Sequence, residues 1–131
     1  MRDEQVRRYS RHIMLPDVGG LGQTTMMVST VRLPLRESEP LAELVAGSYL
    51  VAGGVGTLIV PSSTEAQRAA LSAHGPDTKV VADGELPPSG KELSLAPRPP
   101  WWPSADGDAT ALAFWRGSIA ATQWMADVLS R

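Results

Sequence analysis

Glycines crowd one stretch of the chain, "DVGGLGQTT" (17–25), and glycine-rich turns of this kind can hold phosphate. A P-loop reads G-x-x-x-x-G-K-[ST], in which backbone N–H groups surround the phosphates and a lysine reaches the terminal ones. Here the lysine position holds the neutral Gln23. The stretch also precedes the first predicted strand, whereas phosphate loops directly follow a strand and open a helix. We therefore predict that these glycines only turn the chain from an N-terminal helix into that strand.

No other residues stand in a catalytic or metal-binding pattern. His12 and His74 are far apart, and neither has the serine, cysteine or carboxylate neighbours of a triad. Four aspartates stand in predicted loops beside turn-forming residues: Asp77, Asp83, Asp106 and Asp108. Aspartate is common in turns, which explains them without a catalytic role. The chain has no cysteine, which excludes disulfides, thiolate nucleophiles and cysteine-based zinc sites. The sequence thus predicts no catalytic residue, no cofactor and no metal.

The composition favours one domain that works in solution. The chain has 131 residues, of which 43% are hydrophobic, and a formal net charge of −2, so no basic field favours nucleic acid. Its N-terminal stretch is charged, and no apolar run reaches the roughly 18 residues that span a membrane. We expect a cytoplasmic protein without membrane contact.

The pattern of apolar residues predicts alternating strands and helices. Helices are expected at 3–15, 41–52, 62–75 and 109–129, and strands at 26–33, 56–60, 78–83 and 91–95. This order indicates an α/β fold, a reduced Rossmann-like three-layer domain with a short, mostly parallel sheet of three or four strands. The single domain (1–131) would comprise an N-terminal helical arm (1–25), a β-α-β-α-β core (26–83), a Pro/Gly-rich loop (84–108) and a long C-terminal helix (109–131).

The turn after the first predicted strand lacks the features of a nucleotide loop. It reads "PLRESEP" (34–40), with no glycine, two prolines that lack N–H donors, and the acidic Glu37 and Glu39, which would repel phosphates. A second glycine cluster, "AGGVG" (52–56), falls at the end of a helix, where glycine is an ordinary cap. Neither segment predicts phosphate binding.

Three segments together resemble the ThiF, MoeB and HesA family of E1-like enzymes, which adenylate the C-terminus of ubiquitin-like sulfur-carrier proteins. They are "RYSRHIMLPDVGGLGQ" (8–23), "SYLVAGGVGTLIV" (48–60) and, more loosely, "WRGSIAATQWMADVLSR" (115–131). The family's phosphate loop corresponds here to "PLRESEP", and its acidic pair after the second strand falls on Ser62 and Thr64. Its metal-binding aspartate and its cysteines have no counterparts. The chain is therefore similar to a truncated, degenerate member.

The resemblance implies a pseudoenzyme that binds or organises proteins as a homodimer, with a ubiquitin-like carrier or a full-length active relative as further partner. One alternative is the subunit of an adenylyltransferase whose ATP site is completed by another chain. A second is a small-molecule binder that uses the crevice at the strand ends. In the family, the arginine at the place of Arg11 reaches across a homodimer toward the partner's ATP; the alternative here is a surface ion pair with Asp17 or Glu4.

Residues at both ends of the chain are candidates for the interface. The final helix carries more bulky apolar residues than one small sheet can cover, which indicates a contact surface. The "PRPPWWPS" segment (97–104) is either a polyproline recognition segment or a loop whose indoles cover the core. The candidate interface residues are Arg8, Tyr9, Arg11, His12, Trp101, Trp102, Phe114 and Trp124.

Overall fold

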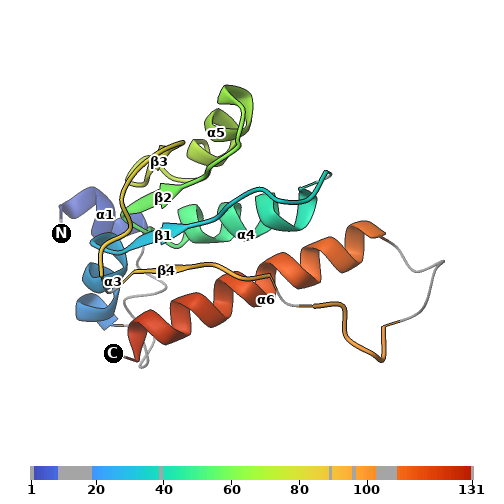
Figure 1. Cartoon of the computed structure of the whole chain (residues 1–131). Helices are drawn as coiled ribbons and strands as arrows, with labels where there is room; N and C mark the ends of the chain where they lie inside the picture. Colours follow the sequence, from blue (N-terminus) through green and yellow to red (C-terminus); the bar gives the residue numbers. More distant parts are fainter. Residues whose placement is uncertain are drawn as a thin grey trace.

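The computed structural model describes residues 2–8, 19–38, 40–88, 90–95, 97–102 and 109–130 (Figure 1). In chain order, the elements are α1 (Asp3–Arg8), α3 (Gly19–Met27), β1 (Thr30–Arg32), α4 (Leu41–Ala52), β2 (Thr57–Ile59), α5 (Glu65–Ser72), β3 (Lys79–Val81), β4 (Lys91–Glu92) and α6 (Ala109–Leu129). Strands and helices alternate from β1 to β3, as the sequence predicts.

The four strands form one parallel sheet in the order β3-β2-β1-β4. Val31 pairs with Leu58, and Leu58 with Val80, so the apolar side chains of the three adjacent strands are in register. α4 connects β1 to β2 and α5 connects β2 to β3, which are the crossovers that parallel neighbours require. The predicted α/β class with a short parallel sheet, a helical N-terminus and a long C-terminal helix is confirmed.

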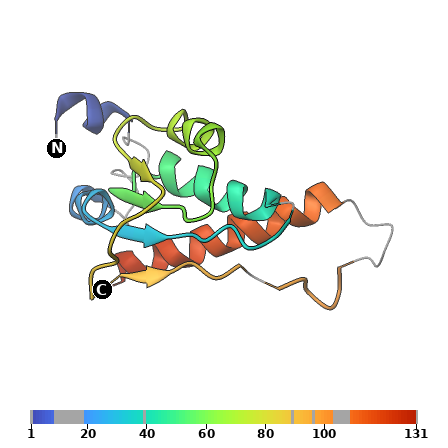
Figure 2. The same cartoon turned by 45° about the horizontal axis from the view of Figure 1, so that its top comes forward.

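The long helices lie on one face of this sheet. α6 packs along α4, and α4 packs beside α5; in Figure 2, α4 and α6 lie behind the strands. In the part of the chain that the structure describes, no helix covers the opposite face, where Gly84 of the β3–β4 segment lies against Ile59. The arrangement differs in this respect from the expected three layers, because β4 is reached by an extended segment without a crossover helix.

The hydrophobic core lies between the sheet and this helical layer. Its fully buried members include Val31 of β1, Leu50 of α4 and Leu58 of β2, each 0% exposed. α6 contributes Ala121 and Trp124, of which Trp124 is 7% exposed. Burial of these side chains supplies the apolar contribution to stability, roughly 25 cal/mol for each Å² removed from water.

Small residues let α6 approach α4 closely. Ala113, Gly117 and Ala121 follow one another at intervals of four on the buried side of α6. A Cβ atom at Gly117 would lie only 2.3 Å from the carbonyl oxygen of Ala42 on α4, which no real side chain tolerates. The two helices therefore touch backbone to backbone at this point, and glycine is required there by space.

The glycine-rich stretch near the N-terminus is helical, which corrects the prediction of a turn. Gly19–Met27 forms α3, which is held by its buried side chains. The Gln23 side chain, 1% exposed, donates from Nε2 to the Gly53 carbonyl at 3.0 Å, and Met26 enters the core. The strand predicted at 26–33 shortens accordingly to Thr30–Arg32. Of the helix predicted at 3–15, α1 accounts for Asp3–Arg8, and residues 9–18 lie outside the described part.

Thr64 caps the start of α5, and the Gly53-Gly54 pair ends α4, whereas α4 begins after Pro40 without a side-chain cap and α5 has Ala73 as its C-cap. α5 begins with a capping box, in which Thr64 Oγ1 accepts from the Gln67 N–H and the Gln67 side chain accepts from the Thr64 N–H. After α4, Gly54 adopts a φ of 86°, the left-handed conformation that favours glycine at a helix-to-strand turn. Among the described helices, none has both the length and the apolar character needed to cross a membrane.

Candidate functional site

The β1–α4 connection stands where a nucleotide loop would be, and the chain itself supplies an anion to it. Glu43, in the first turn of α4, is 2% exposed. Its Oε2 accepts from the backbone N–H of Arg36 at 2.7 Å and its Oε1 from that of Glu37 at 3.2 Å. These are N–H groups of the kind that a phosphate loop offers to its ligand. A phosphate at this place would have to displace a buried carboxylate of the same charge sign.

Arg36 and Glu37, the charged residues of this connection that the structure describes, are both in ion pairs. Arg116 of α6 bonds to Glu37 at 3.0 Å, with 23% of the arginine side chain exposed. Arg36 binds Glu92 of β4, and Arg32 lies 3.8 Å from the same carboxylate. The connection is thereby held to β4 on one side and to α6 on the other.

The helical layer differs from that of the open parallel sheets that hold ligands at their strand ends. In those sheets, a crevice forms where the strand order reverses and the helices that follow the two adjacent strands lie on opposite faces. Here the order reverses between β1 and β4, but α4 and α6 lie on the same face and contact each other directly. A hollow of about 390 Å³ nevertheless lies after β1, between the β1–α4 connection and the first turns of α6, and Glu37, Ser38 and Arg116 are among the residues that line it. The small-molecule alternative therefore stays a prediction.

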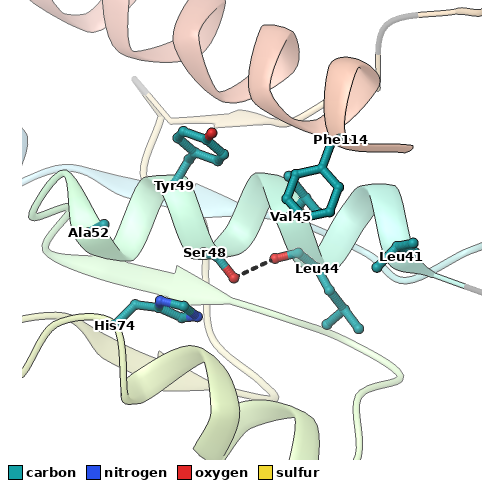
Figure 3. Close-up of a pocket in the computed structure, with 8 residues that line it drawn as sticks. All are labelled: Leu41, Leu44, Val45, Ser48, Tyr49, Ala52, His74 and Phe114. Atoms are coloured by element: carbon teal, nitrogen blue, oxygen red, sulfur yellow. Dashed lines mark hydrogen bonds between the residues drawn. The ribbon is translucent and has the colours of Figure 1, made fainter. Parts of the chain in front are cut away.

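An apolar hollow lies on the outer surface of α4, between α5 and α6 (Figure 3). This α4 groove has a volume of about 440 Å³ and is lined by Leu41, Leu44, Val45, Ser48, Tyr49, Ala52, His74 and Phe114. Three of its large apolar side chains project into solvent: Leu41 is 40% exposed, Tyr49 46% and Phe114 50%. A second hollow of about 260 Å³ continues between α4 and α5 and shares Leu44, Ser48 and His74 with the first.

The groove offers little to a polar ligand. Its floor hydroxyl, that of Ser48, donates to the Leu44 carbonyl at 2.8 Å within the helix, which Figure 3 shows as a dashed line. The other polar groups are the imidazole of His74 and the hydroxyl of Tyr49, both on its walls. An occupant of this groove must therefore be largely apolar.

α4 and α6 carry few charges, and all of them are engaged elsewhere, while α5 on the other side of the groove carries Glu65 and Arg68. α4 contains one charged residue, Glu43, and α6 contains two, Arg116 and Asp127. Glu43 is turned into the β1–α4 connection, Arg116 binds Glu37, and Asp127 lies 3.5 Å from Lys91. A helix face that meets only water usually carries several charged residues. This face resembles the core of an interface, where charged residues are depleted and aromatic residues enriched.

The structure separates the predicted interface residues. Phe114 projects into the α4 groove, while Trp124 belongs to the core, so Trp124 is no longer a candidate for contact. Trp101 is 69% exposed, and its ring centroid lies 5.9 Å from that of the tilted Trp102 ring and 5.9 Å from that of Trp115, which it meets edge to face. The Trp segment thus covers one side of α6 and still leaves one indole in solvent.

The remaining candidates are at the N-terminus. Arg8 ends α1, and its side chain is outside the described part of the structure, as are Tyr9, Arg11 and His12. Their predicted roles at an interface stay predictions. Within the described residues, no group of three or more His, Cys, Asp or Glu side chains could hold a metal ion.

Sequence reasoning missed Leu41, Tyr49 and Glu43 as site residues. The available signal was the composition of "LAELVAGSYLVA", a helix that is apolar on every side. Such a helix is buried on every side or contacts a partner. In this domain α4 has the sheet on one side only, and Leu41 and Tyr49 of its outer surface are exposed.

No protein-family model matches this chain, and no curated protein matches it in sequence. The likeness to E1-like enzymes rests on the three sequence segments quoted above, and its functional content belongs to the proposal below.

Proposed function

We propose that this chain is a non-catalytic protein-binding domain on a reduced E1-like frame, and that it assembles as a homodimer. The observation that carries the proposal is the uncharged outer face of α4, where Leu41, Tyr49 and Phe114 remain 40 to 50% exposed around an apolar groove. Exposed apolar patches of this kind mark contact surfaces, because covering them removes apolar area from water.

The β1–α4 connection supports the non-catalytic part of the proposal. Its backbone N–H groups at Arg36 and Glu37 are already bonded to the buried Glu43 carboxylate. In the family that the sequence resembles, this segment would wrap the phosphates of ATP. Here, the carboxylate takes the place of that anion and fixes the connection without a ligand.

The resemblance suggests which further partners belong to the proposal. A ubiquitin-like carrier protein or a full-length active relative would meet the homodimer through its remaining surface. The proposal also includes the cytoplasmic location predicted from the composition and the charged N-terminal stretch.

A thermal melt with nucleotide tests the proposal. Because a ligand that binds only the folded state raises the melting temperature by mass action, an ATP-binding chain would shift upward in millimolar ATP with Mg²⁺. We expect no shift beyond that seen with Mg²⁺ and inorganic sulfate at the same ionic strength. A rise of several degrees specific to ATP would overturn the proposal and favour the adenylyltransferase alternative.

A further inference from the structure

We propose that the hollow after β1 binds a small carboxylic acid with an apolar body, whose carboxylate is held by Arg116 of α6. This Arg116 hollow has a volume of about 390 Å³ and lies between the β1–α4 connection and the first turns of α6. Of its lining residues, only Leu41 also lines the α4 groove. The inference therefore goes beyond the proposed function and does not depend on the homodimer.

The position and lining of the Arg116 hollow suit a small ligand. Open parallel sheets hold ligands beyond the carboxyl ends of their strands, and the β1–α4 connection starts at that end of β1. The volume falls within the roughly 300 to 1,000 Å³ of small-molecule sites. The lining combines the apolar Leu41, Ala42, Leu112 and Ala113 with the polar Ser38 and Thr110 and the ion pair of Glu37 and Arg116. Its occupant therefore needs an apolar body and a polar end.

The direction of α4 and α6 favours a negative charge at this end of the layer. A Cβ atom at Gly117 would meet Ala42 near the start of α4, and one at Gly53, just after α4, would meet Met125 further along α6. The two helices therefore run parallel and begin at the same end, as Figure 1 shows. Each helix N-terminus carries a partial positive charge, and the first turns of both helices line the hollow, so both dipoles favour an anion there.

Arg116 supplies the specific contact for the carboxylate. Only 23% of its side chain is exposed, and it bonds to the carboxylate of Glu37 at 3.0 Å. The Glu37 side chain is 40% exposed, and an ion pair with so exposed a partner is weak. The backbone of Glu37 is held separately, because its N–H donates to Glu43. A ligand carboxylate can therefore replace the Glu37 side chain on Arg116 while the connection keeps its path.

Displacement of Glu37 leaves the hollow with a net positive charge. Glu37 and Arg116 are the charged residues among those that line it in the described part of the chain. Glu43, the buried acidic residue of the same region, accepts from the N–H groups of Arg36 and Glu37, so its charge is compensated locally. The hollow should therefore select a carboxylate over an amine or an amide with the same apolar body.

Thermal melts with matched small molecules test this selectivity. Phenylacetate and hexanoate combine a carboxylate with an apolar body, acetate lacks the body, and phenylacetamide and phenethylamine lack the negative charge. Because a ligand of the folded state raises the melting temperature, we expect about 2 to 5 °C from phenylacetate or hexanoate at about 10 mM. The other three should give no rise at the same ionic strength. No rise with either apolar carboxylate, or an equal rise with phenylacetamide or phenethylamine, would overturn the inference.

Two substitutions that break the same ion pair should act in opposite directions. Arg116→Gln removes the anchor, so the affinity for the carboxylate, measured by calorimetry, should fall at least about tenfold. Glu37→Gln removes the internal competitor and should raise this affinity about two- to fivefold. Melting curves show whether each variant folds. If Arg116→Gln does not fold, Glu37→Gln still decides, because an affinity no higher than that of wild type would overturn the displacement of Glu37.

Light scattering on the same samples separates this inference from the proposed function. If an apolar carboxylate binds and the mass is the 14.0 kDa of one chain, the Arg116 hollow stands as a ligand site and the homodimer is overturned. If none binds and the mass is twice that of one chain, the homodimer stands and the ligand site is overturned.

Discussion

Glu43 shows how one buried carboxylate can determine the character of a loop. The residue lies in the first turn of α4, where a negative charge also interacts favourably with the helix dipole. Its two oxygens satisfy two backbone N–H groups that are otherwise without a partner of their own in a strand or helix. Because burial makes an unsatisfied N–H costly, this carboxylate stabilises the β1–α4 connection as a bound phosphate stabilises a nucleotide loop.

Substitution of Glu43 by alanine should destabilise the fold. The Arg36 and Glu37 N–H groups lose their acceptor. A hydrogen bond to a charged group contributes about 1.5 to 3 kcal/mol to stability. We therefore expect Glu43→Ala to lower the free energy of unfolding by about 2 kcal/mol in urea titrations. Glu85→Ala, an exposed acidic residue of the β3–β4 segment, is the matched control and should change it by less than about 0.5 kcal/mol. Equal stability of the two variants would contradict the role assigned to Glu43.

The sequence could not reveal this role. A lone glutamate three residues after Pro40 looks like an ordinary acidic residue in the first turn of a helix. Only the path of the connection after β1 brings the N–H groups of residues 36 and 37 back onto its side chain. The sequence did indicate that this connection is no phosphate loop, because "PLRESEP" lacks the glycines of such a loop.

At the scale of elements, the contact between α4 and α6 organises the helical layer. It depends on Gly117, where an added methyl group would meet the Ala42 carbonyl at 2.3 Å and the Ala46 nitrogen at 2.9 Å. Both atoms belong to helix backbone, which cannot move aside as a flexible side chain can. The two helices would have to separate, and the core between them and the sheet would lose close packing.

Gly117→Ala should therefore be destabilising, although alanine is the better helix former. The gain in helix propensity is about 1 kcal/mol, whereas overpacking costs typically 1 to 3 kcal/mol and more against rigid backbone. We expect a net loss of at least about 1 kcal/mol in the free energy of unfolding. Gln123→Ala, an exposed position on the same helix, should stay within about 0.5 kcal/mol of wild type. A stabilised Gly117→Ala would mean that the helices do not touch as described.

The elements with clear signals in the sequence were the most predictable. α6 has the predicted bounds 109–129, and α4 and α5 lie within the ranges predicted for them. α3 was not predictable, because glycine and threonine are poor helix formers and "GGLGQTTMM" shows no apolar stripe. Tertiary contacts of Gln23 and Met26 override these local preferences. The single helical layer was equally unpredictable, because the sequence does not show that the extended β3–β4 segment leaves one face of the sheet without a helix.

At the scale of the whole molecule, the surplus apolar surface predicted for the last helix is present, but it is shared with α4. Phe114 was a candidate from the sequence, and it meets Leu41 and Tyr49 of α4 at one groove. Trp124 was a candidate for the same reason and is instead buried against the sheet. Side-chain type alone could not separate the two, because both stand in one apolar helix and differ only in the direction that they face.

A charge placed in the α4 groove should dissociate the homodimer and leave each chain folded. Tyr49 is 46% exposed, so Tyr49→Lys can point its ammonium group into water in the monomer, but the dimer would have to bury that charge. We expect a mass of one chain by light scattering at concentrations where wild type gives two, with a melting curve that remains cooperative. Gln123→Lys is the control, because Gln123 lies nine positions after Phe114 and therefore on about the opposite side of α6. Dissociation by both variants would count against the α4 groove as the interface.

The measurement that most directly tests the central claim is the mass of the wild-type chain in solution. Size-exclusion chromatography with light scattering, at micromolar concentration and moderate salt, should give twice the 14.0 kDa of one chain. The uncharged face of α4 and α6 predicts this result, because two copies bury the exposed groove residues against each other. A mass of 14.0 kDa that persists at the highest concentrations tested would contradict the account.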